Sequence, residues 1–555
     1  MSKNIVSSWQ RLISLLEMDK RDVFQVIYYA VFAGLVSLSL PLGIQAIINL
    51  IQGAQISTSW VVLVILVTLG VAFVGVLQLM QLRIIENVQQ KIFTRSSFEF
   101  AYRFPKIKMS ELHNYYPPEL ANRFFDTLTV QKGLSKVLID FPAALLQIIF
   151  GLLLLSFYHP FFIVYGLLLL LLIYVVFKFT AQKGLDTSLD ESKRKYKVAH
   201  WIQEIARSII SFKLSGKTSH ALDKNDALVN DYLEAREGHF RILVIQFIQM
   251  VGFKVMVTAG LLLIGGLLVL NQEMNIGQFV AAEIIILLVI GSVEKLISGL
   301  ETFYDLLTSL EKLGQVVDKE LEPQGGEDPF TDRHGFHVEI SNISYKDPDR
   351  NKMIVDNVSL DITEGSMILL RGGVGSGKST LLRIIAGIVT PTSGSVYINS
   401  VSLKGVDLSI YRSQLGQSLT DESPFEGTLL DNITFGSKLI SQDRIYWALE
   451  KVGLSQFVKE QPMGLQTMLY PEGKQIPYTI SKKIVLARGI VIKPKLLILK
   501  DPLDQFREDE ATRIIDFLTD PENGWALLVV SENIKWSRCC AKIVTMENGQ
   551  IINTK

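Results

Sequence analysis

Cysteine is scarce in this sequence, and neither sign of charge is in excess. The 555 residues include two cysteines, the neighbours Cys539 and Cys540. Two adjacent cysteines exclude a disulfide framework, and we expect a buried, inert pair in a reducing cytosol, with a redox role as the alternative. Lys+Arg and Asp+Glu number 55 each. The chain therefore has neither the basic field that would indicate nucleic acid as a partner nor an acidic disordered tail.

The stretch 1–22 lacks the pattern of a cleavable signal peptide, because it carries acidic residues and precedes an apolar run too long for a signal h-region. Apolar residues, in contrast, are abundant. They make up 48% of the chain, and the mean hydropathy is +0.30. This composition excludes an ordinary soluble protein, and 555 residues are enough for two or three domains.

Six apolar segments are long enough to cross a bilayer as helices, which takes about 20 residues. They are 23–51, 60–82, 138–158, 161–179, 243–270 and 279–300. Pro41 and Pro142 lie inside two of them, which membrane helices tolerate. The short connections carry no Lys or Arg, whereas the long connections 83–137 and 180–242 are rich in both. The positive-inside rule therefore predicts a multi-pass protein of the cell (inner) membrane, in contact with membrane lipid, with both termini in the cytoplasm.

The two long loops are predicted to be ordered. Apolar residues recur at helical spacing across 84–104 and 198–214, so we expect the membrane helices to continue into the cytoplasm. Each loop would then expose a short crossing segment to whatever docks against it. We expect these crossing segments at 118–126 and 205–213.

Charged residues inside a membrane are functional candidates by default. Lys254 lies in the fifth predicted span, and Glu283, Glu294 and Lys295 lie in the sixth. At about 1.5 Å per residue, Lys254 and Glu294 come to similar depths and could form a pair; the alternative is that Glu294 and Lys295 face water. Glu283 lies deeper in its span. Lys254 and Glu283 are therefore our candidates for a substrate pathway.

A phosphate-binding motif lies in the second half of the chain. The motif G-x-x-x-x-G-K-[ST] is matched by Gly372, Gly373, Val374, Gly375, Ser376, Gly377, Lys378, Ser379 and Thr380. We predict a buried strand over 367–370 before it and a helix over 381–386 after it, which is the context the motif requires. In this pattern backbone N–H groups surround the phosphates of ATP, Lys378 reaches the terminal phosphates, and Ser379 offers a hydroxyl to Mg²⁺.

A linker rich in helix-breaking residues, 321–329, separates the two halves. After it, predicted strands and helices alternate as in an α/β domain, beginning with a strand at 338–345. We therefore divide the chain into an N-terminal segment 1–22, a transmembrane domain 23–318, a linker 319–335 and a nucleotide-binding domain 336–555.

Taken together, these features resemble an ABC exporter half-transporter over nearly the whole chain. The resemblance implies a multi-domain fold, an all-α six-helix transmembrane domain followed by an α/β P-loop NTPase domain. Tyr345 matches the aromatic residue that stacks on adenine in that family. The family's other segments are matched by 393–399, 411–416, 425–433, 487–488 and 494–499. The crossing segments would be the coupling helices, and 37–42 is similar to the branch that secretes proteins and peptides, although no peptidase precedes it.

The chain departs from the family at four catalytic positions. Where the family has Asp for the Mg²⁺ shell and then Glu as base, this sequence has Lys500 and Asp501. Asp501 is therefore the catalytic candidate, but one carboxylate is missing in either register. The signature loop falls at 476–480, where Pro477 lacks an N–H. The expected glutamine is Thr420, and the expected histidine is Glu532.

These residues leave three functions open. The first is an exporter half that moves a peptide, protein, lipid or small molecule outward when ATP closes a homodimer or heterodimer with another half-transporter. The second is a pseudo-ATPase subunit in which ATP binding regulates or assembles a membrane complex. The third is a relic that only stabilises the membrane domain. A periplasmic accessory protein is a further partner that peptide and protein secretion would imply.

Overall fold

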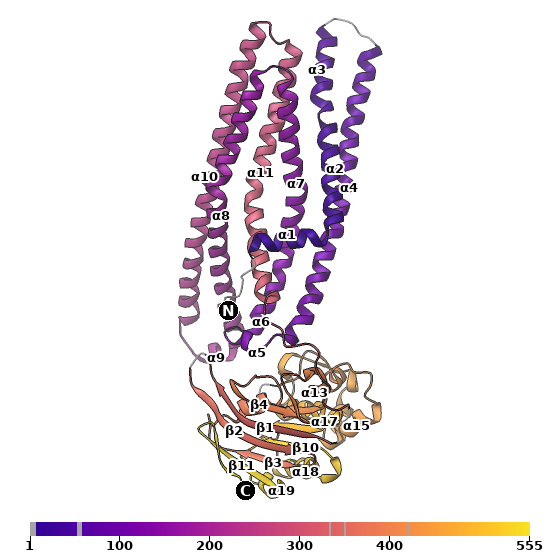
Figure 1. Ribbon diagram of the computed structural model, residues 1–555, viewed down its shortest axis with the longest axis vertical. Coiled ribbons are helices and arrows are strands. Elements are labelled where there is room, and N and C mark those ends of the chain that lie inside the picture. Colours follow the sequence, from indigo (N-terminus) through magenta and orange to yellow (C-terminus); the bar gives the residue numbers. More distant parts are fainter. Residues whose placement is uncertain (1–6, 53–57, 332–334, 349–350, 420–421, 555) are drawn as a thin grey trace. The chain divides into compact units, whose positions relative to one another are not determined.

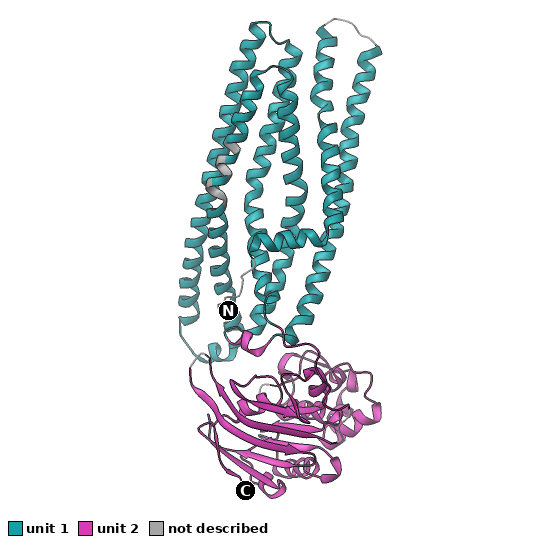
Figure 2. Ribbon diagram, in the orientation of Figure 1, with its two compact units in different colours: residues 1–107, 114–320 teal, residues 108–113, 321–555 magenta. Residues whose placement is uncertain are grey.

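The computed structural model of the protein describes residues 7–52, 58–331, 335–348, 351–419 and 422–554, without the side chains of 172, 173, 175–177 and 179–181. It divides into two compact units, 1–107 with 114–320 and 108–113 with 321–555 (Figure 2). Unit 1 consists of helices, and unit 2 contains the strands (Figure 1). Each unit is described below by itself.

Unit 1 is built from long helices. Their bounds are α1 Ser8–Met18, α2 Lys20–Ser37, α3 Ser39–Gln52, α4 Thr58–Arg103, α6 Pro117–Ala121, α7 Asp126–Ser156, α8 Phe161–Arg207, α9 Ile209–Leu214, α10 His220–Leu270 and α11 Ile276–Val317, with the short 3₁₀ helices η1 Phe104–Lys106 and η2 Asn122–Phe125. The expected helical continuations are confirmed: α4 runs on through 84–103, and α8 runs to Arg207, where α9 follows after a break at Ser208.

The first predicted span is interrupted. α2 ends at Ser37, and α3 begins at Ser39 with Pro41 as its third residue. A proline N–H is missing and its ring clashes with the preceding turn, whereas the first turn of a helix needs no such N–H. Pro41 therefore restarts the helix, while Pro142 is accommodated inside α7.

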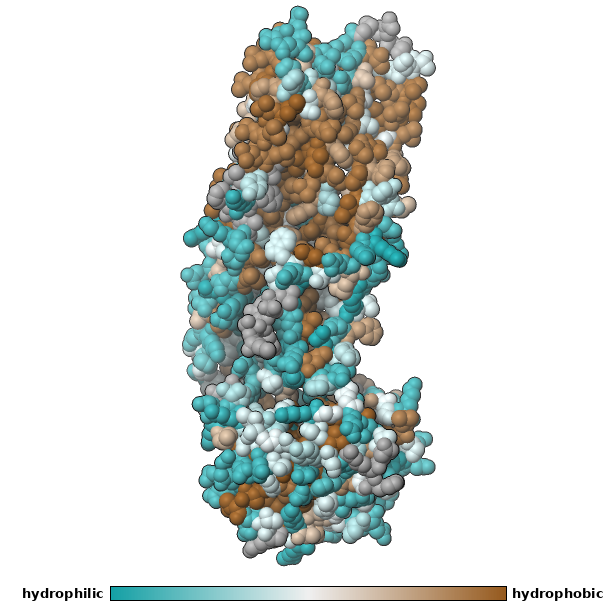
Figure 3. Space-filling model, in the orientation of Figure 1, coloured by the Kyte–Doolittle hydropathy of each residue, from teal (hydrophilic) through white to brown (hydrophobic). Residues whose placement is uncertain are grey.

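Apolar side chains cover the surface of part of unit 1. Five helical stretches of the described residues are long and apolar enough to cross a membrane: 20–52, 58–106, 117–156, 220–270 and 276–317. A sixth, 161–171, is shorter, because the rest of that predicted span falls largely on undescribed side chains. Figure 3 shows the apolar side chains gathered over one half of the helices, with hydrophilic ones over the half that ends at α9. Val62, Leu69 and Leu263 are among the exposed apolar side chains of these helices.

Unit 2 is an α/β domain. Its strands are β1 His337–Lys346, β2 Met353–Thr363, β3 Met367–Arg371, β4 Ser393–Ile398, β5 Val401–Ser402, β6 Leu415–Ser418, β7 Gly427–Thr428, β8 Met468–Leu469, β9 Leu496–Lys500, β10 Ala526–Val530, β11 Lys542–Glu547 and β12 Gln550–Thr554. Its helices are α5 Met109–Leu112, α12 Lys378–Ile385, α13 Leu408–Ser413, α14 Leu429–Thr434, α15 Gln442–Lys451, α16 Ser455–Glu460, α17 Tyr478–Val491, α18 Glu508–Leu518 and α19 Trp536–Cys539, with 3₁₀ turns at Gly464–Gln466, Pro471–Gly473 and Pro521–Asn523.

A six-stranded sheet of order β12-β11-β3-β10-β9-β6 forms the centre of unit 2. Its strands from β11 to β6 are parallel, and β12 pairs antiparallel with β11. Alternate side chains of the central strands point to opposite faces, because a strand has a period of two. Ile368 and Leu370 therefore join the core that includes the antiparallel sheet β2-β1-β4-β5, whereas Leu369 joins the core with α14, α15 and α17.

Candidate nucleotide-binding site

The phosphate-binding motif lies between β3 and α12, as the sequence predicts. The strand is confirmed at Met367–Arg371, and the helix begins three residues earlier than expected, at Lys378. Lys378 Nζ donates hydrogen bonds to the carbonyl of Gly373 at 2.7 Å, to that of Gly372 and to Ser376 Oγ at 3.1 Å. The lysine and the free N–H groups at the start of α12 therefore converge on the loop, which is an arrangement that binds phosphate.

Two glycines of this loop are required by the backbone around them. Gly377 caps α12 at φ +96°, and a Cβ there would lie 2.4 Å from the carbonyl oxygen of Ile354. Gly372 has φ +150°, and its Cβ would lie 2.2 Å from the carbonyl oxygen of Met546. A side chain at either position would therefore push the loop away from its neighbouring strands.

A cavity of about 550 Å³ opens over this loop. Of the nine motif residues, all except Gly373 line it, together with Lys500, Asp501, Glu532 and Asn548 and with Asp347, Lys352, Met353 and Ile354 from the β1–β2 region. The volume is within the range of small-molecule and cofactor sites. The family resemblance singles out positions 500, 501 and 532. Asn548 and the β1–β2 residues carry no local signal, because Asn548 follows β11, a neighbour of β3 in the central sheet, and the β1–β2 residues come from the other sheet.

Tyr345 is placed differently from the other predicted nucleotide-binding residues. It lies in β1 opposite Val355 and packs, partly buried, against the core between the sheets. It is absent from the described residues that line the cavity, although Asp347, two residues further on, is among them. The stacking of Tyr345 on adenine stays a prediction from the family resemblance.

Three charged residues lie at the carboxyl edge of the central sheet: Lys500, Asp501 and Glu532. Val530 in β10 is paired with Leu370 on one side and with Lys500 on the other. The phosphate loop, Glu532 and Asp501 therefore follow three adjacent strands at the same edge. Asp501 is held there by its N–H, which donates to the Val530 carbonyl at 2.8 Å, in a left-handed conformation of φ +44°.

The electrostatics of this edge couple the lysine of the motif to the two carboxylates. Burial lowers the pKa of the Lys378 ammonium, and the nearby charges of Glu532 and Asp501 oppose that shift. Burial also raises the pKa of the Asp501 carboxyl, and Lys500 opposes this. Asp501 is therefore a carboxyl group beside the phosphate loop, and its burial disfavours its ionised form.

The signature positions 476–480 lead into α17. Pro477 is the residue before the helix, Tyr478 is its first residue and is exposed, and Ile476 and Ile480 pack against the core. Burial raises the pKa of Tyr478, and the charges of Asp504 and Asp501 add to the shift. These side chains do not reproduce the small Ser and Gly residues that would clamp a phosphate. Thr420, at the glutamine position, lies outside the described residues.

The donor set at the cavity does not fit a Mg²⁺ ion held in the usual way. A P-loop NTPase holds the ion through the P-loop hydroxyl and a carboxylate that follows the neighbouring strand. Ser379 supplies the hydroxyl, but Lys500 puts an ammonium at the end of β9. Among the described residues, no cluster of three or more His, Cys, Asp or Glu side chains could hold a metal.

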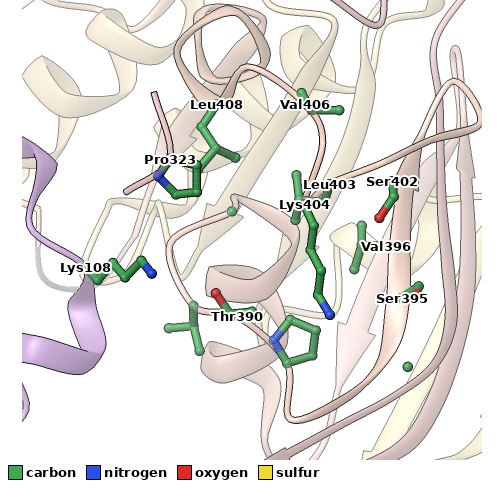
Figure 4. A pocket seen from close by; sticks show the side chains of 14 residues that line it. Lys108, Pro323, Thr390, Ser395, Val396, Ser402, Leu403, Lys404, Val406 and Leu408 are labelled. Atoms are coloured by element: carbon green, nitrogen blue, oxygen red, sulfur yellow. The ribbon is translucent and has the colours of Figure 1, made fainter. Parts of the chain in front are cut away.

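The structure corrects the first predicted crossing segment. Residues 108–113, which include α5, belong to unit 2, whereas the expected segment 118–126 forms α6, η2 and the start of α7 in unit 1. The helical periodicity of this loop ends at residue 104, so it indicates neither stretch. Lys108 lines a second cavity of about 220 Å³ with Pro323, Thr390 and Lys404 (Figure 4), and His113 Nε2 lies 3.7 Å from Asp347 Oδ1.

The intramembrane candidates lie in α10 and α11. Lys254 Nζ is 3.8 Å from Glu294 Oε2, so the predicted pair is present. Both side chains are about half exposed, so the pair contributes little to stability. Glu283 is partly buried in α11 and has no ion-pair partner among the described side chains. Its place in a substrate pathway stays a prediction.

Two family models match the chain. The model of the ABC transporter transmembrane region covers residues 23–293, and the ABC transporter model covers 355–504. The chain belongs to the ABC transporter family. It is a multi-pass membrane protein in which an ABC transporter transmembrane region is fused to an ABC transporter ATP-binding domain.

Similar proteins agree with this assignment. The "Alpha-hemolysin translocation ATP-binding protein HlyB" of Escherichia coli O157:H7 is 26% identical over 306 residues, 55% of this chain and 43% of that protein. The "ATP-dependent lipid A-core flippase" of Burkholderia orbicola is 27% identical over 282 residues, 51% of this chain and 47% of that protein. The chain thus spans less than half the length of these relatives. The structure of a bacterial Atm1-family ABC exporter with ATP bound has the same fold, with a TM-score of 0.84 at 15% identity over 96% of this chain and 95% of that one.

Proposed function

We propose that the chain is one half of an ATP-binding exporter that moves a substrate out of the cytoplasm when ATP closes two such halves on each other. The observation that carries this proposal is the intact phosphate cradle. Lys378, the motif glycines and the start of α12 border a cavity of about 550 Å³, in a chain that also has helices long enough to cross a membrane. ATP bound there would be a ligand for which the closed dimer has the higher affinity.

The membrane topology of the proposal rests on the distribution of basic residues. The spans 23–51, 60–82, 138–158, 161–179, 243–270 and 279–300 would cross the membrane, with both termini and the nucleotide-binding domain in the cytoplasm, where ATP is available. The partner would be a second ABC half-transporter, either a copy of this chain or another. A periplasmic accessory protein would be a further component of a complex that secretes a polypeptide.

A contact inside unit 2 supports the proposed coupling between nucleotide and transport. Asp347 lines the cavity and is 3.7 Å from His113. His113 ends the segment 108–113, which lies in the chain between the long helices α4 and α7, with η1 before it and α6 and η2 after it. Movement of the β1–β2 region on nucleotide binding would therefore act on a segment that connects two long helices.

Catalysis by this half is expected to be slow. Phosphoryl transfer depends on positioned charges, and Lys500, Pro477 and Glu532 replace three of the groups that supply them. Asp501 is the remaining candidate for the base. In a homodimer both composite sites would have these changes. With an intact partner, one site would lack the carboxylate and the other the signature.

Two of the relatives carry names that indicate substrate classes, one for alpha-hemolysin translocation and one for lipid A-core. We therefore propose a peptide, a protein or a lipid as the substrate, ahead of a small molecule. The family contains all of these classes, and the chain has no motif that separates them.

The proposed function is tested by measuring ATP-driven closure in lipid nanodiscs. Cys539 and Cys540 are replaced by alanine, a spin label is placed at the exposed position Leu439, and label-to-label distances are measured by electron spin resonance with and without ATP. The proposal predicts a shorter distance with ATP that is lost in Lys378→Ala. An unchanged distance distribution in a dimer that binds ATP would contradict closure. A sample without any dimer would direct the same measurement to the complex purified with its native partner half.

A further inference from the structure

The inference concerns Lys500 and rests on the proposed binding of ATP at the cavity. We propose that the Lys500 ammonium takes the place of Mg²⁺ as the positive charge facing the terminal phosphates, so that this half binds nucleotide without a divalent cation.

The position of Lys500 is set by strand register. It is the last residue of β9 and lies opposite Val530, whose other partner is Leu370, two residues before Gly372. Strands are about 4.8 Å apart, so Lys500 lies two strands, roughly 10 Å, from the strand that enters the phosphate loop. A lysine side chain can span much of that distance, and Lys500 lines the same cavity as Lys378 and Ser379.

Lys500 also has no partner among the residues that the structure describes. It is partly buried, and the described side chains and carbonyls offer it no hydrogen bond or ion pair, although its charge is felt at both Asp501 and Lys378. An ammonium that is partly removed from water without a partner is unfavourable. An anion in the cavity would supply the missing partner, and a second cation there would be repelled.

The sum of charges explains how a lysine can replace a metal. In a P-loop NTPase one carboxylate and one divalent cation occupy this place, and their charges add up to a single positive charge. Lys500 supplies a single positive charge alone. The substitution thus keeps the field that faces the phosphates but removes the ligand that would hold the ion.

The effect of substituting Glu532 distinguishes a metal-free site from a site that holds Mg²⁺. Three carboxylates line the cavity: Asp347, Asp501 and Glu532. Of these, Asp501 and Glu532 follow the central strands β9 and β10, and together with Ser379 they are the alternative Mg²⁺ ligands. If Glu532 held a cation, its loss would weaken binding. If Lys500 replaces the cation, Glu532 only repels the phosphates, and Glu532→Gln strengthens binding in the absence of metal.

The experiment measures binding of radiolabelled ATP to the full chain in nanodiscs, once with excess Mg²⁺ and once with EDTA. The proposal predicts that wild-type affinity differs less than about threefold between the two conditions, well under the factor that one charged contact contributes. It predicts that Lys500→Met weakens binding about 10- to 100-fold in both, as expected for loss of a hydrogen bond to a charged group. Lys500→Asp is predicted to bind only with Mg²⁺.

Matched controls keep these outcomes interpretable. Lys459→Met removes a lysine from α16, outside the cavity, and is predicted to leave both affinities unchanged. Thermal melting without nucleotide shows that each variant is folded. Wild-type binding that falls about tenfold or more in EDTA, or that is abolished by Glu532→Gln, would overturn the metal-free site while the proposed ATP binding stands. Absence of wild-type binding in both conditions would overturn both proposals.

Discussion

Alanine at Gly377 and alanine at Gly375 form a matched pair of substitutions in the phosphate loop. Both glycines have left-handed backbone, with φ +96° and φ +82°. An L side chain in this conformation costs about 1–2 kcal/mol, so both variants lose this amount. They differ in their surroundings. A Cβ at Gly377 would lie 2.4 Å from the Ile354 carbonyl oxygen, whereas a Cβ at Gly375 meets no described atom within 4 Å.

The contact at Gly377 cannot be relieved by a rotamer change, because Ile354 O is a backbone atom of β2. Overpacking of this kind costs about 1–3 kcal/mol in addition. We therefore expect the free energy of unfolding to fall by about 1–2 kcal/mol in Gly375→Ala and by about 2–5 kcal/mol in Gly377→Ala. In a domain of this size each kcal/mol lowers the melting temperature by about 2–4 °C.

The assay is thermal unfolding of the full chain without nucleotide, followed by tryptophan fluorescence, to which the fully buried Trp525 and Trp536 of the same unit contribute. Gly377→Ala is predicted to melt roughly 2–12 °C below Gly375→Ala. Equal melting temperatures, or a lower value for Gly375→Ala, would refute the idea that close approach to β2 determines this glycine.

Four further predictions concern the rest of the chain. Burial raises the pKa of Cys540 to about 12, so iodoacetamide at pH 8 is expected to modify it only after unfolding, as mass spectrometry of folded and denatured samples would show. Burial raises the pKa of Asp501, so the folded protein binds this proton more tightly than the unfolded chain, and the free energy of unfolding falls as pH rises through the folded pKa. Asp501→Asn is therefore expected to have a melting temperature no lower than that of wild type at pH 7.5, and a melting temperature that depends less on pH. Glu322 accepts two hydrogen bonds from Arg412, at 2.6 and 2.9 Å, and Glu322→Gln is expected to cost about 1–3 kcal/mol, with most of that loss absent when Arg412 is already Met. Glu283→Gln is expected to change substrate-stimulated ATP turnover without lowering the melting temperature, and a purely structural role would show the reverse.

The phosphate loop could be predicted because its motif combines chemistry with local structure. A strand before Gly372 and a helix after Gly377 follow from short-range patterns, and both are present. Lys500 and Glu532 could be singled out through the family resemblance, because they occupy the positions after two apolar strands where the family has catalytic groups. What their positions in the sequence could not give is that both lie at one sheet edge, because strand order is a long-range property.

The differences have equally local causes. Pro41 divides the first predicted span, because proline has no N–H to continue the helix, although the apolar run continues through it. α2 therefore ends at Ser37 and α3 begins at Ser39. The segment 108–113 was missed because its sequence is as compatible with helix as 118–126, and only tertiary contact assigns it to unit 2. Tyr345 is predicted to stack on adenine from its family position, and this stays a prediction; the residue lies opposite Val355 and packs, partly buried, against the core.

The measurement that tests the central claim most directly compares equilibrium ATP binding and ATP turnover in the full chain with those in Lys378→Ala. Lys378 carries the positive charge of the phosphate loop, and its Nζ donates hydrogen bonds to Gly372, Gly373 and Ser376. The account predicts that wild type binds ATP, cleaves it slowly, and loses both properties in the variant. Equal binding by the two proteins, or no binding by wild type, would contradict it.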